Sequence, residues 1–498
     1  MWSELEVDRG LRAPVFWYDP TPSYYATAGD ARIRKRGFDI IEVKRYPAYK
    51  DSGVPWLGDV PAHWSQLPGR ACFREVKTPN TGLVETTVLS LSYGRIVVRN
   101  PESLHGLVPA SFETYQIVEP GEIIVRPTDL QNDWNSLRFA ICRNRGIITS
   151  AYLCFRTRAA LTPGYGHLLL HSYDLMKVFY GLGSGLRQNL DWEDFKYLPC
   201  LVPPLPEQTA IVRFLAHTDR QVNRLIRAKR RLIELLNEEK QAIIHRAVTR
   251  GLDPTARLKP SGVEWLGDVP AHWEVNPIKA EMTCLNRRRV PMSGVERDKM
   301  TVRAYDYYGA SGVIDRVANY IFDGELILIA EDGANLVLRN LPLAIIARGK
   351  FWVNNHAHVL EPRDGNLEYL ASVLECIDYN TWISGAAQPK LTKDRLMAVR
   401  IPVPPVREQD LIMAQIHSET SELTLTVELA RREIALLREY RTRLIADVVT
   451  GKLDVREAAA SLPDEDQGPE PPDEGGGIMD TEEDVVDEFD ALPEEEDV

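Results

Sequence analysis

The sequence predicts an α/β (α+β) fold built twice: two related globular domains joined by two long helices, with a pseudo-twofold internal repeat. The string WLGDVPAHW occurs at residues 56–64 and again at 265–273, and Ser-Gly-Val stands just before each copy. PPLPEQ at 203–208 is echoed by PPVREQ at 404–409. Both echoes lie about two hundred residues apart, which suits a whole domain with an appendage rather than a solenoid repeat.

The two echoes divide the chain into domains, helices and termini. The segments that we predict are an atypical N-terminal extension (1–45), a first domain (46–202), a first long helix (203–251), a second domain (252–402), a second long helix (403–452) and an acidic, disordered tail (453–498).

Each PPxxEQ echo opens an uninterrupted helical pattern. Apolar residues recur at spacings of three and four from Ile211 to Ala247 and from Ile412 to Val448, and a glycine follows each run. Proline at the start and glycine past the end are typical limits of a helix. Each helix would hold roughly 40 residues and span ~60 Å. The narrow stripe predicts a coiled-coil seam, with charged residues such as Lys229 interrupting it.

Within each predicted domain, short β-rich runs are separated by glycine or proline, which predicts short strands. The predicted strands are 96–98, 122–125, 147–149, 325–328 and 350–353, and a helix is expected in each domain, around 168–180 and 367–384. The chain order is therefore domain, helix, domain, helix, tail. Because the first helix leads to the second domain and the second helix leaves it, two helices that pair must form an antiparallel coiled coil. Two similar domains on such a rod suit a partner with two similar halves.

Composition excludes some classes of protein. No apolar run approaches the ~18–20 residues that span a bilayer, and the charged start MWSELEVDRG does not look like a signal peptide. Six scattered cysteines without a CxxC pair favour reduced thiols over a zinc ribbon. We therefore expect a cytoplasmic protein without a membrane partner.

The net charge of −13 is concentrated in the tail. From residue 463 onward the chain holds seventeen Asp and Glu and no Lys or Arg. Without this tail, 59 basic residues face 72 − 17 = 55 acidic ones, so that the body carries about +4. The body is therefore compatible with a polyanionic partner, and the tail has the composition of a disordered segment.

The order of segments and the motifs together resemble the specificity (S) subunit of type I restriction–modification systems. The resemblance covers about 46–455, and the stretches that carry it are 46–64, 261–273, 132–139, 307–315, 321–336, 351–362 and the two PPxxEQ helix starts. It implies that the domains are target recognition domains, each reading one half of a split double-stranded DNA sequence. It also implies that the helices space them and dock two methyltransferase subunits, with two translocase–endonuclease subunits completing the complex. S-adenosylmethionine, ATP and Mg²⁺ would then be bound by these partners, and the subunit itself would be non-catalytic, without catalytic residues, metal or cofactor.

Polar and aromatic residues in the loops of the β-rich segments are the candidates for reading DNA. Arg, Asn and Gln distinguish base edges, and Arg, Lys and small hydroxyls hold phosphates. In the first domain the candidates are Tyr93, Arg95, Arg126, Gln131, Asn132, Trp134, Asn135 and Arg138. In the second domain they are Tyr305, Tyr307, Tyr308, Ser311, Asn335, Arg339 and Lys390.

Two further patterns allow other chemistry. His356 and His358 would share one face of a strand, but no third metal ligand stands at a useful spacing, which favours a structural role. Asp39, Glu42 and Lys44 have the ExK end of a nuclease site. The alternatives are therefore a self-sufficient nuclease or modification enzyme, and an acidic-tailed scaffold that reads no sequence. No P-loop or glycine-rich cofactor loop appears, which places methylation and ATP hydrolysis in partners.

Overall fold

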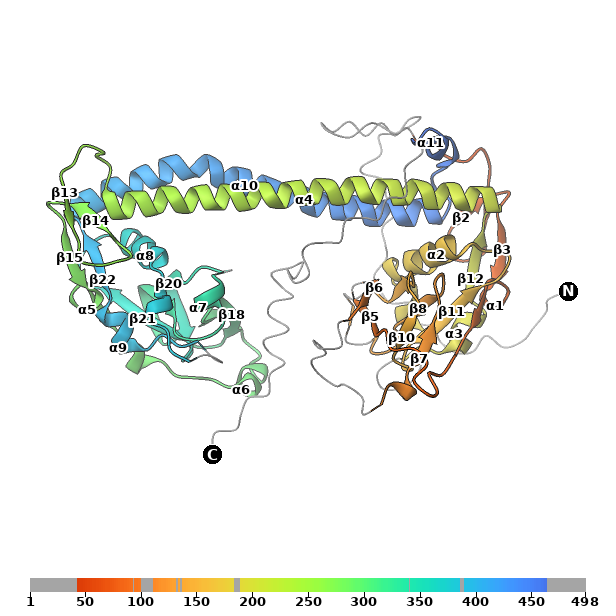
Figure 1. The fold of residues 1–498 in the computed structure, drawn as a ribbon, viewed down its shortest axis with the longest axis horizontal. Helices are drawn as coiled ribbons and strands as arrows, with labels where there is room; N and C mark the ends of the chain where they lie inside the picture. The colour runs from red at the N-terminus through yellow and green to blue at the C-terminus, as the bar shows by residue number, and fades with distance from the viewer. Residues whose placement is uncertain are drawn as a thin grey trace. The chain divides into compact units, whose positions relative to one another are not determined.

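The computed structural model of the chain divides into two compact units (Figure 1). The structure describes residues 43–92, 94–99, 111–130, 133–134, 137–182, 189–339, 341–385 and 389–463. One unit takes residues 1–221 and 439–498, and the other takes 222–438. Each long helix contributes one part to each unit.

The described part of the first unit combines short strands with four shorter helices and parts of the two long ones. Its strands are β1 (Tyr49–Asp51), β2 (Asp59–Pro61), β3 (Ser65–Pro68), β4 (Phe73–Glu75), β5 (Leu89–Ser92), β6 (Arg95–Val98), β7 (Gln116–Val118), β8 (Ile123–Val125), β9 (Phe139–Ile141), β10 (Gly146–Ile148), β11 (Leu153–Thr157) and β12 (Pro199–Val202). Its helices are α1 (Gly69–Cys72), α2 (Pro163–Leu175), α3 (Trp192–Lys196), the start of α4 (Leu205–Arg250), the end of α10 (Val406–Val449) and α11 (Arg456–Ala460).

The central sheet of the first unit has the order β4-β11-β8-β9 and is antiparallel throughout. Helix α2 covers it, starting at Pro163 after Thr162, whose side chain accepts from the backbone N–H of Tyr165 as a helix cap does. Aromatic rings fill the space between them: Tyr165 and Tyr173 are fully buried in the same core as Trp64. This aromatic core fixes the sheet against the helix.

The second unit repeats this plan with longer strands. Its strands are β13 (Leu258–Pro260), β14 (Asp268–Pro270), β15 (Glu274–Pro277), β16 (Met282–Cys284), β17 (Tyr305–Gly309), β18 (Gly312–Val317), β19 (Phe322–Ala330), β20 (Ala344–Val353), β21 (Ala357–Pro362) and β22 (Arg400–Val403). Its short helices are α5 (Ile278–Glu281), α6 (Gly294–Asp298), α7 (Asn335–Leu338), α8 (Leu367–Cys376) and α9 (Lys393–Ala398).

The correspondence between the units extends to strand pairing. Hairpin β13–β14 matches β1–β2, and the pair β15–β22 matches β3–β12. The six-stranded sheet β16-β21-β19-β20-β17-β18 begins with the same pattern as β4-β11-β8-β9 and adds the hairpin β17–β18, which joins β20 in parallel. Helix α8 takes the place of α2, and its Tyr369 is buried as Tyr165 is. The predicted duplication is therefore confirmed at the level of individual strands.

The long helices extend to 46 residues in α4 and 44 in α10. Helix α2 has 13 residues and begins and ends five residues before the predicted range 168–180, whereas α8 starts as predicted and ends early, at Cys376. In the second unit α4 and α10 lie side by side in opposite directions (Figure 1). Two ion pairs between the helices show the direction: Lys229 pairs with Glu433, and the later Arg246 pairs with the earlier Glu419 at 3.5 Å.

The seam between the long helices differs from the predicted one in its middle. Ile226, Val427 and Ile434 are buried there, each one position after a residue of the predicted seam (Leu225, Thr426 and Glu433). Of the other predicted seam residues, Ala430 is buried and Leu232 is 40% exposed. In this region, apolar residues at spacings of three and four form two neighbouring stripes along each helix, and packing against the partner helix selects one of them. The charged interruption at Lys229 is compensated by its ion pair with Glu433.

The predicted tail boundary at residue 453 was wrong. Residues 453–463 fold onto the first unit, where Val455, Ala458, Ala459 and Leu462 are buried in its core. Arg213 of α4 holds the last described residues by donating to the carbonyls of Leu462 at 2.8 Å and Pro463 at 3.1 Å. Within the described ranges, no helix is long and apolar enough to cross a membrane.

Candidate nucleic-acid interface

Eleven of the fifteen predicted DNA-reading residues lie in the described parts of the chain. Tyr93, Gln131, Asn132 and Asn135 lie outside them. The prediction placed all fifteen candidates in loops, but Arg95, Tyr305, Tyr307 and Tyr308 lie in strands and Asn335 begins helix α7. The remaining six lie in loops or turns: Arg126, Trp134, Arg138, Ser311, Arg339 and Lys390. Some are exposed, and others hold the loops together.

Arg138 is completely buried at the base of the β8–β9 loop. Its guanidinium donates to the carbonyls of Thr128 at 2.6 Å and Asp133 at 2.7 Å, with longer bonds to two more loop carbonyls. Its backbone N–H donates to the Asp174 carboxylate at 2.9 Å. The expectation that Arg138 contacts DNA directly is therefore corrected: in this structure it supports the loop. The carbonyls that bury it come from several residues, and the sequence pattern does not show that they converge.

The same loop presents an aromatic ring and two cations. Trp134 is 46% exposed and stacks on Tyr180, with ring centroids 4.5 Å apart. Lys177 donates to the carbonyl of Trp134 at 2.5 Å, and Arg126 pairs with Asp133 at 3.2 Å. Lys177 and Tyr180 were missed from the sequence, because nothing in their local pattern distinguishes them from a helix end. Together these side chains form a surface that suits stacking and phosphate contact.

Arg95 is exposed on the hairpin β5–β6, which packs beside the central part of the first unit through Leu89. It remains a candidate for phosphate contact.

The hairpin β17–β18 carries four candidates of the second unit. Tyr307 is buried: its hydroxyl donates to the Met292 carbonyl at 3.3 Å and the Arg297 guanidinium lies over its ring. Tyr307 is therefore a core residue in this structure, which corrects the expectation of direct contact. Strand alternation explains it, since neighbouring residues of a strand point to opposite faces. Tyr305 and Tyr308 are half-buried, and Ser311 is exposed in the turn.

Asn335 and Arg339 shape the loop after β19. The Asn335 amide donates to the Leu341 carbonyl at 3.1 Å and accepts from its N–H at 2.9 Å, closing the loop. Arg339 has φ +52° and donates to the carbonyls of Glu375 and Ile377 at the end of α8. Both side chains are engaged by the protein's own backbone, so that their role here is to hold the loop.

Lys390 belongs to a charged cluster with Glu331, Asp332, His356 and Arg289. Arg289 donates to Glu331 at 2.7 Å, Lys390 lies 3.5 Å from Glu331, and His356 pairs with Asp332 at 2.9 Å. The hydrogen bond to Asp332 raises the pKa of His356. The two carboxylates thus gather three basic side chains, of which Lys390 and His356 are exposed to about half.

The metal hypothesis for His356 and His358 finds no support in the described ranges, where no three His, Cys, Asp or Glu side chains are arranged to hold a metal ion. His358 is fully buried, and Asn286 lies 2.8 Å from its Nδ1. Its Nε2 lies 2.7 Å from the Leu391 carbonyl and must donate to it, so Nδ1 accepts from Asn286. Burial lowers the pKa of His358. His358 is a neutral, structural histidine.

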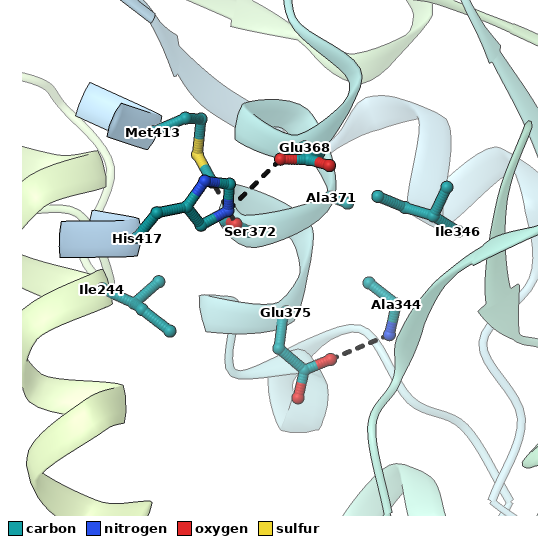
Figure 2. Close-up of a pocket in the computed structure, with 9 residues that line it drawn as sticks. All are labelled: Ile244, Ala344, Ile346, Glu368, Ala371, Ser372, Glu375, Met413 and His417. Carbon is teal, nitrogen blue, oxygen red and sulfur yellow. Dashed lines mark hydrogen bonds and ion pairs between the residues drawn. The ribbon is translucent and has the colours of Figure 1, made fainter. Parts of the chain in front are cut away.

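A cavity of about 320 Å³ in the second unit lies where α8 meets β20 and the long helices (Figure 2). Ile244, Ile346 and Met413 give it an apolar wall, and His417 pairs with Glu368 at 3.3 Å across its rim. None of the predicted DNA-reading residues lines it.

Of the residues in the ExK pattern near the N-terminus, the structure describes Lys44. Lys44 donates to Glu457 of α11 at 3.0 Å, and its carbonyl accepts from the backbone N–H of Asp454. Asp39 and Glu42 lie outside the described residues.

Comparison with known proteins assigns this architecture to a class. The family model of the type I restriction modification DNA specificity domain matches residues 272–430. This is most of the second unit, from the second tryptophan motif into the second long helix. Residues 272–430 are thus similar to a type I restriction modification DNA specificity domain.

Two curated relatives and one solved structure extend the match. A type I restriction enzyme specificity subunit of Haemophilus influenzae is 33% identical over 166 residues, which is 33% of this chain and 39% of that protein. The MjaX specificity subunit of Methanocaldococcus jannaschii is 22% identical over 308 residues, 59% of this chain and 69% of that protein. A chain from a solved type I restriction–modification assembly shares the fold, with a TM-score of 0.53 and 15% identity over 78% of this chain and 98% of that chain. The chain spans less than half the length of the Haemophilus relative, and over the matched residues it is similar to type I restriction enzyme specificity subunits.

Proposed function

We propose that this protein is the DNA-sequence-recognition subunit of a type I restriction–modification complex and reads a bipartite target. The observation that carries the proposal is the duplication. The same framework of hairpin, strand pair, sheet and capping helix is built twice, and its second copy matches the DNA specificity domain. Each copy would read one half of a split double-stranded DNA sequence.

In this proposal the two domains are held apart by an antiparallel coiled coil. The ion pairs between α4 and α10 in the second unit support it, as does the pair between Arg441 and Asp219 at 3.5 Å in the first unit. Charges that interrupt the apolar stripe are thereby compensated between the helices, which allows a long helix pair without an ideal seam.

We propose direct DNA contact for side chains that are exposed or half-buried in the structure. In the first domain these are Arg95, Arg126, Trp134 and Lys177, and in the second Tyr305, Tyr308, Ser311, His356 and Lys390. Tyr93, Gln131, Asn132 and Asn135 remain proposals from the sequence. In this proposal Arg138, Asn335 and Arg339 hold loops in place, and Tyr307 is a core residue of its hairpin.

The protein itself would carry out no chemistry in this complex. Two methyltransferase subunits and two translocase–endonuclease subunits would act at the site it selects, and they would bind S-adenosylmethionine, ATP and Mg²⁺. Purified protein incubated with DNA and these cofactors should neither cut nor methylate, and addition of the partner subunits should restore both activities. Cleavage or methylation by the protein alone would favour a self-sufficient enzyme instead.

Exchange of one domain tests the proposal that each domain reads one half of the target. Residues 65–200 are replaced with the matching domain of another specificity subunit, and the methylated sequence is determined in cells that contain the partner subunits. Only one half of the target should change. The reciprocal exchange of the second domain should change only the other half. A change in both halves, or in neither, would contradict the proposal.

A further inference from the structure

The repeated tryptophan motif lies at the base of the long helices in both units, and its geometry is the same in each. In the first unit Trp64 Nε1 donates to Oε1 of Glu207 at 2.9 Å, and His63 Nε2 donates to Oε2 of the same carboxylate at 2.9 Å. Glu207 is the glutamate of the first PPxxEQ echo and lies in the first turn of α4. The two motifs that recur in the sequence are therefore bound to each other.

The end of the other long helix meets the same tryptophan. Gly451 follows α10, and a Cβ at this position would lie 3.1 Å from Cζ3 of Trp64 and against Pro61. Its φ of +79° is also one that glycine adopts readily. The motif thus contacts the first turn of one long helix and the residue just past the end of the other. We call His63, Trp64, Glu207 and Gly451 the first helix joint.

The second unit contains the second helix joint, formed by His272, Trp273, Glu408 and Gly251. Trp273 Nε1 donates to Glu408 Oε1 at 3.0 Å, and His272 Nε2 donates to Glu408 Oε2 at 2.8 Å. A Cβ on Gly251, which follows α4, would lie 3.1 Å from Cζ2 of Trp273. The order of the helices is exchanged: here α10 begins and α4 ends.

Neighbouring contacts are duplicated as well. Lys50 and Lys259 each donate to the carbonyl of the joint tryptophan at 2.5 Å. Gln208 and Gln409, which follow the joint glutamates, each accept a backbone N–H from the residue that precedes α2 or α8 at 2.8 Å. The EQ dipeptide therefore ties each helix start both to the tryptophan motif and to the helix that covers the sheet.

We propose that the two helix joints fix the position and rotation of each recognition domain on the helix pair, and that Glu207 and Glu408 are the positioning residues. This inference rests on the proposed function of the helices as spacers. A joint that contacts both helices at once resists bending and rotation more than a single chain connection would. Helix length can set the distance between half-sites only if the domains do not swing on their helices.

The requirement for rigidity follows from the geometry of DNA. One added base pair in the spacer moves a half-site by ~3.4 Å and turns it by about 35° around the duplex axis. A domain on a rigid joint cannot follow that turn, whereas a domain on a loosened joint can. Loss of the joint should therefore relax the choice of spacer length while leaving the base-reading loops unchanged.

The two joints differ in burial, which gives an internal comparison. The Glu207 side chain is 4% exposed and receives a third donor, the Tyr46 hydroxyl at 2.5 Å, whereas that of Glu408 is 26% exposed. The Arg456 guanidinium lies over the Tyr46 ring, so that the C-terminal segment closes the first joint. Glu408 is the better position for a variant that must stay folded.

The experiment measures methylation by the full complex on DNA substrates whose spacers have the natural length n, n − 1 or n + 1 base pairs. Glu408→Ala removes both hydrogen bonds, and we expect the preference for n over n ± 1 to fall about tenfold, since 1.4 kcal/mol corresponds to a factor of ten. Glu408→Gln keeps an acceptor for Trp273 Nε1 and should retain the preference. Glu428→Ala, on an exposed face of α10, is the matched control and should match the wild-type protein.

Trp273→Phe provides a second variant in case Glu408→Ala does not fold, because it removes the Nε1 donor while keeping Glu408 and a smaller aromatic ring at the joint. It should relax the preference in the same direction and to a smaller extent. If either folded variant loses activity equally on all three spacers, the joint is merely structural and the inference is overturned. A wild-type complex that reads no bipartite sequence at all would instead contradict the proposed function and leave no spacer preference to relax.

Discussion

Replacing Arg138 with methionine removes the guanidinium that holds the β8–β9 loop while keeping a side chain of similar length. Two of its hydrogen bonds, to the carbonyls of Thr128 and Asp133, are short at 2.6 and 2.7 Å, and three others, at 3.3 to 3.4 Å, are longer. A hydrogen bond to a charged group contributes about 1.5–3 kcal/mol. The methionine avoids burying a charge, which offsets part of the loss. We expect a net cost of about 3 kcal/mol to the loop conformation, taking the two short bonds at the lower end of that range.

A cost of this size changes the population of the loop conformation about a hundredfold, at a factor of ten per 1.4 kcal/mol. If the loop reads one half-site, discrimination at that half-site should fall while the other half-site is read normally. Methylome sequencing of cells that carry the variant measures both halves at once, and thermal unfolding of the purified protein measures the stability cost. At about 2–4 °C for each kcal/mol in a domain of this size, the melting temperature should fall by about 6–12 °C.

Two comparisons make the Arg138 prediction refutable. Arg138→Lys keeps the charge but has a single nitrogen in place of the planar fork, so that it should give an intermediate effect. Arg339→Met is the matched variant in the second unit, where the guanidinium holds two carbonyls at the end of α8. It should impair only the other half-site. If Arg138→Met impairs both half-sites equally, or leaves the first half-site unchanged, the positioning role is wrong.

Three further predictions test the spacer, the tail and a buried acid. Inserting one heptad after residue 238 of α4 and a matching heptad after residue 424 of α10 keeps the helices paired and lengthens them by ~10 Å. The methylated site should then gain about three base pairs of spacer with unchanged half-sites. An unaltered spacer would show that the helices do not set the distance between half-sites. Truncation after Pro463 removes the acidic tail and retains the residues held by Arg213. If the tail competes with DNA, the truncated complex should bind non-specific DNA more tightly at ~50 mM salt, and the difference should shrink at higher salt. Equal affinities with and without the tail would leave it only a solubility role. Burial raises the pKa of Asp174 to about 6. The native state therefore retains a proton that the unfolded chain has lost, and the free energy of unfolding should fall as pH rises from about 4 to about 6. Chemical denaturation of Asp174→Asn should lack this dependence on pH, and the same dependence in both proteins would show that Asp174 is not its source.

The sequence by itself determined the architecture in outline. An identical nine-residue string and two PPxxEQ echoes could only come from duplication, and the limits of the long helices followed from proline and glycine, because these residues restrict the backbone locally. Strands with β-branched residues between glycines were placed correctly for the same reason. The resemblance to specificity subunits, which the sequence motifs carried, agrees with the family match over 272–430.

The tertiary structure decided what the individual side chains do. Arg138 and Tyr307 look like exposed polar residues of loops and strands, but the folding of the surrounding chain buries them. Carbonyls of its own loop enclose Arg138, and the Met292 carbonyl and the Arg297 guanidinium cover Tyr307. The seam of the long helices moved by one residue because packing on a partner helix chose between two adjacent stripes. Residues 453–463 carry too few large apolar residues to predict that they fold, and they fold because the first unit offers a core to cover. Glu207 and Glu408 stood in a recognised echo, but their partners lie 143 and 135 residues away in the tryptophan motifs. Contacts over such separations depend on how the whole domain packs, and local patterns of residues do not encode them.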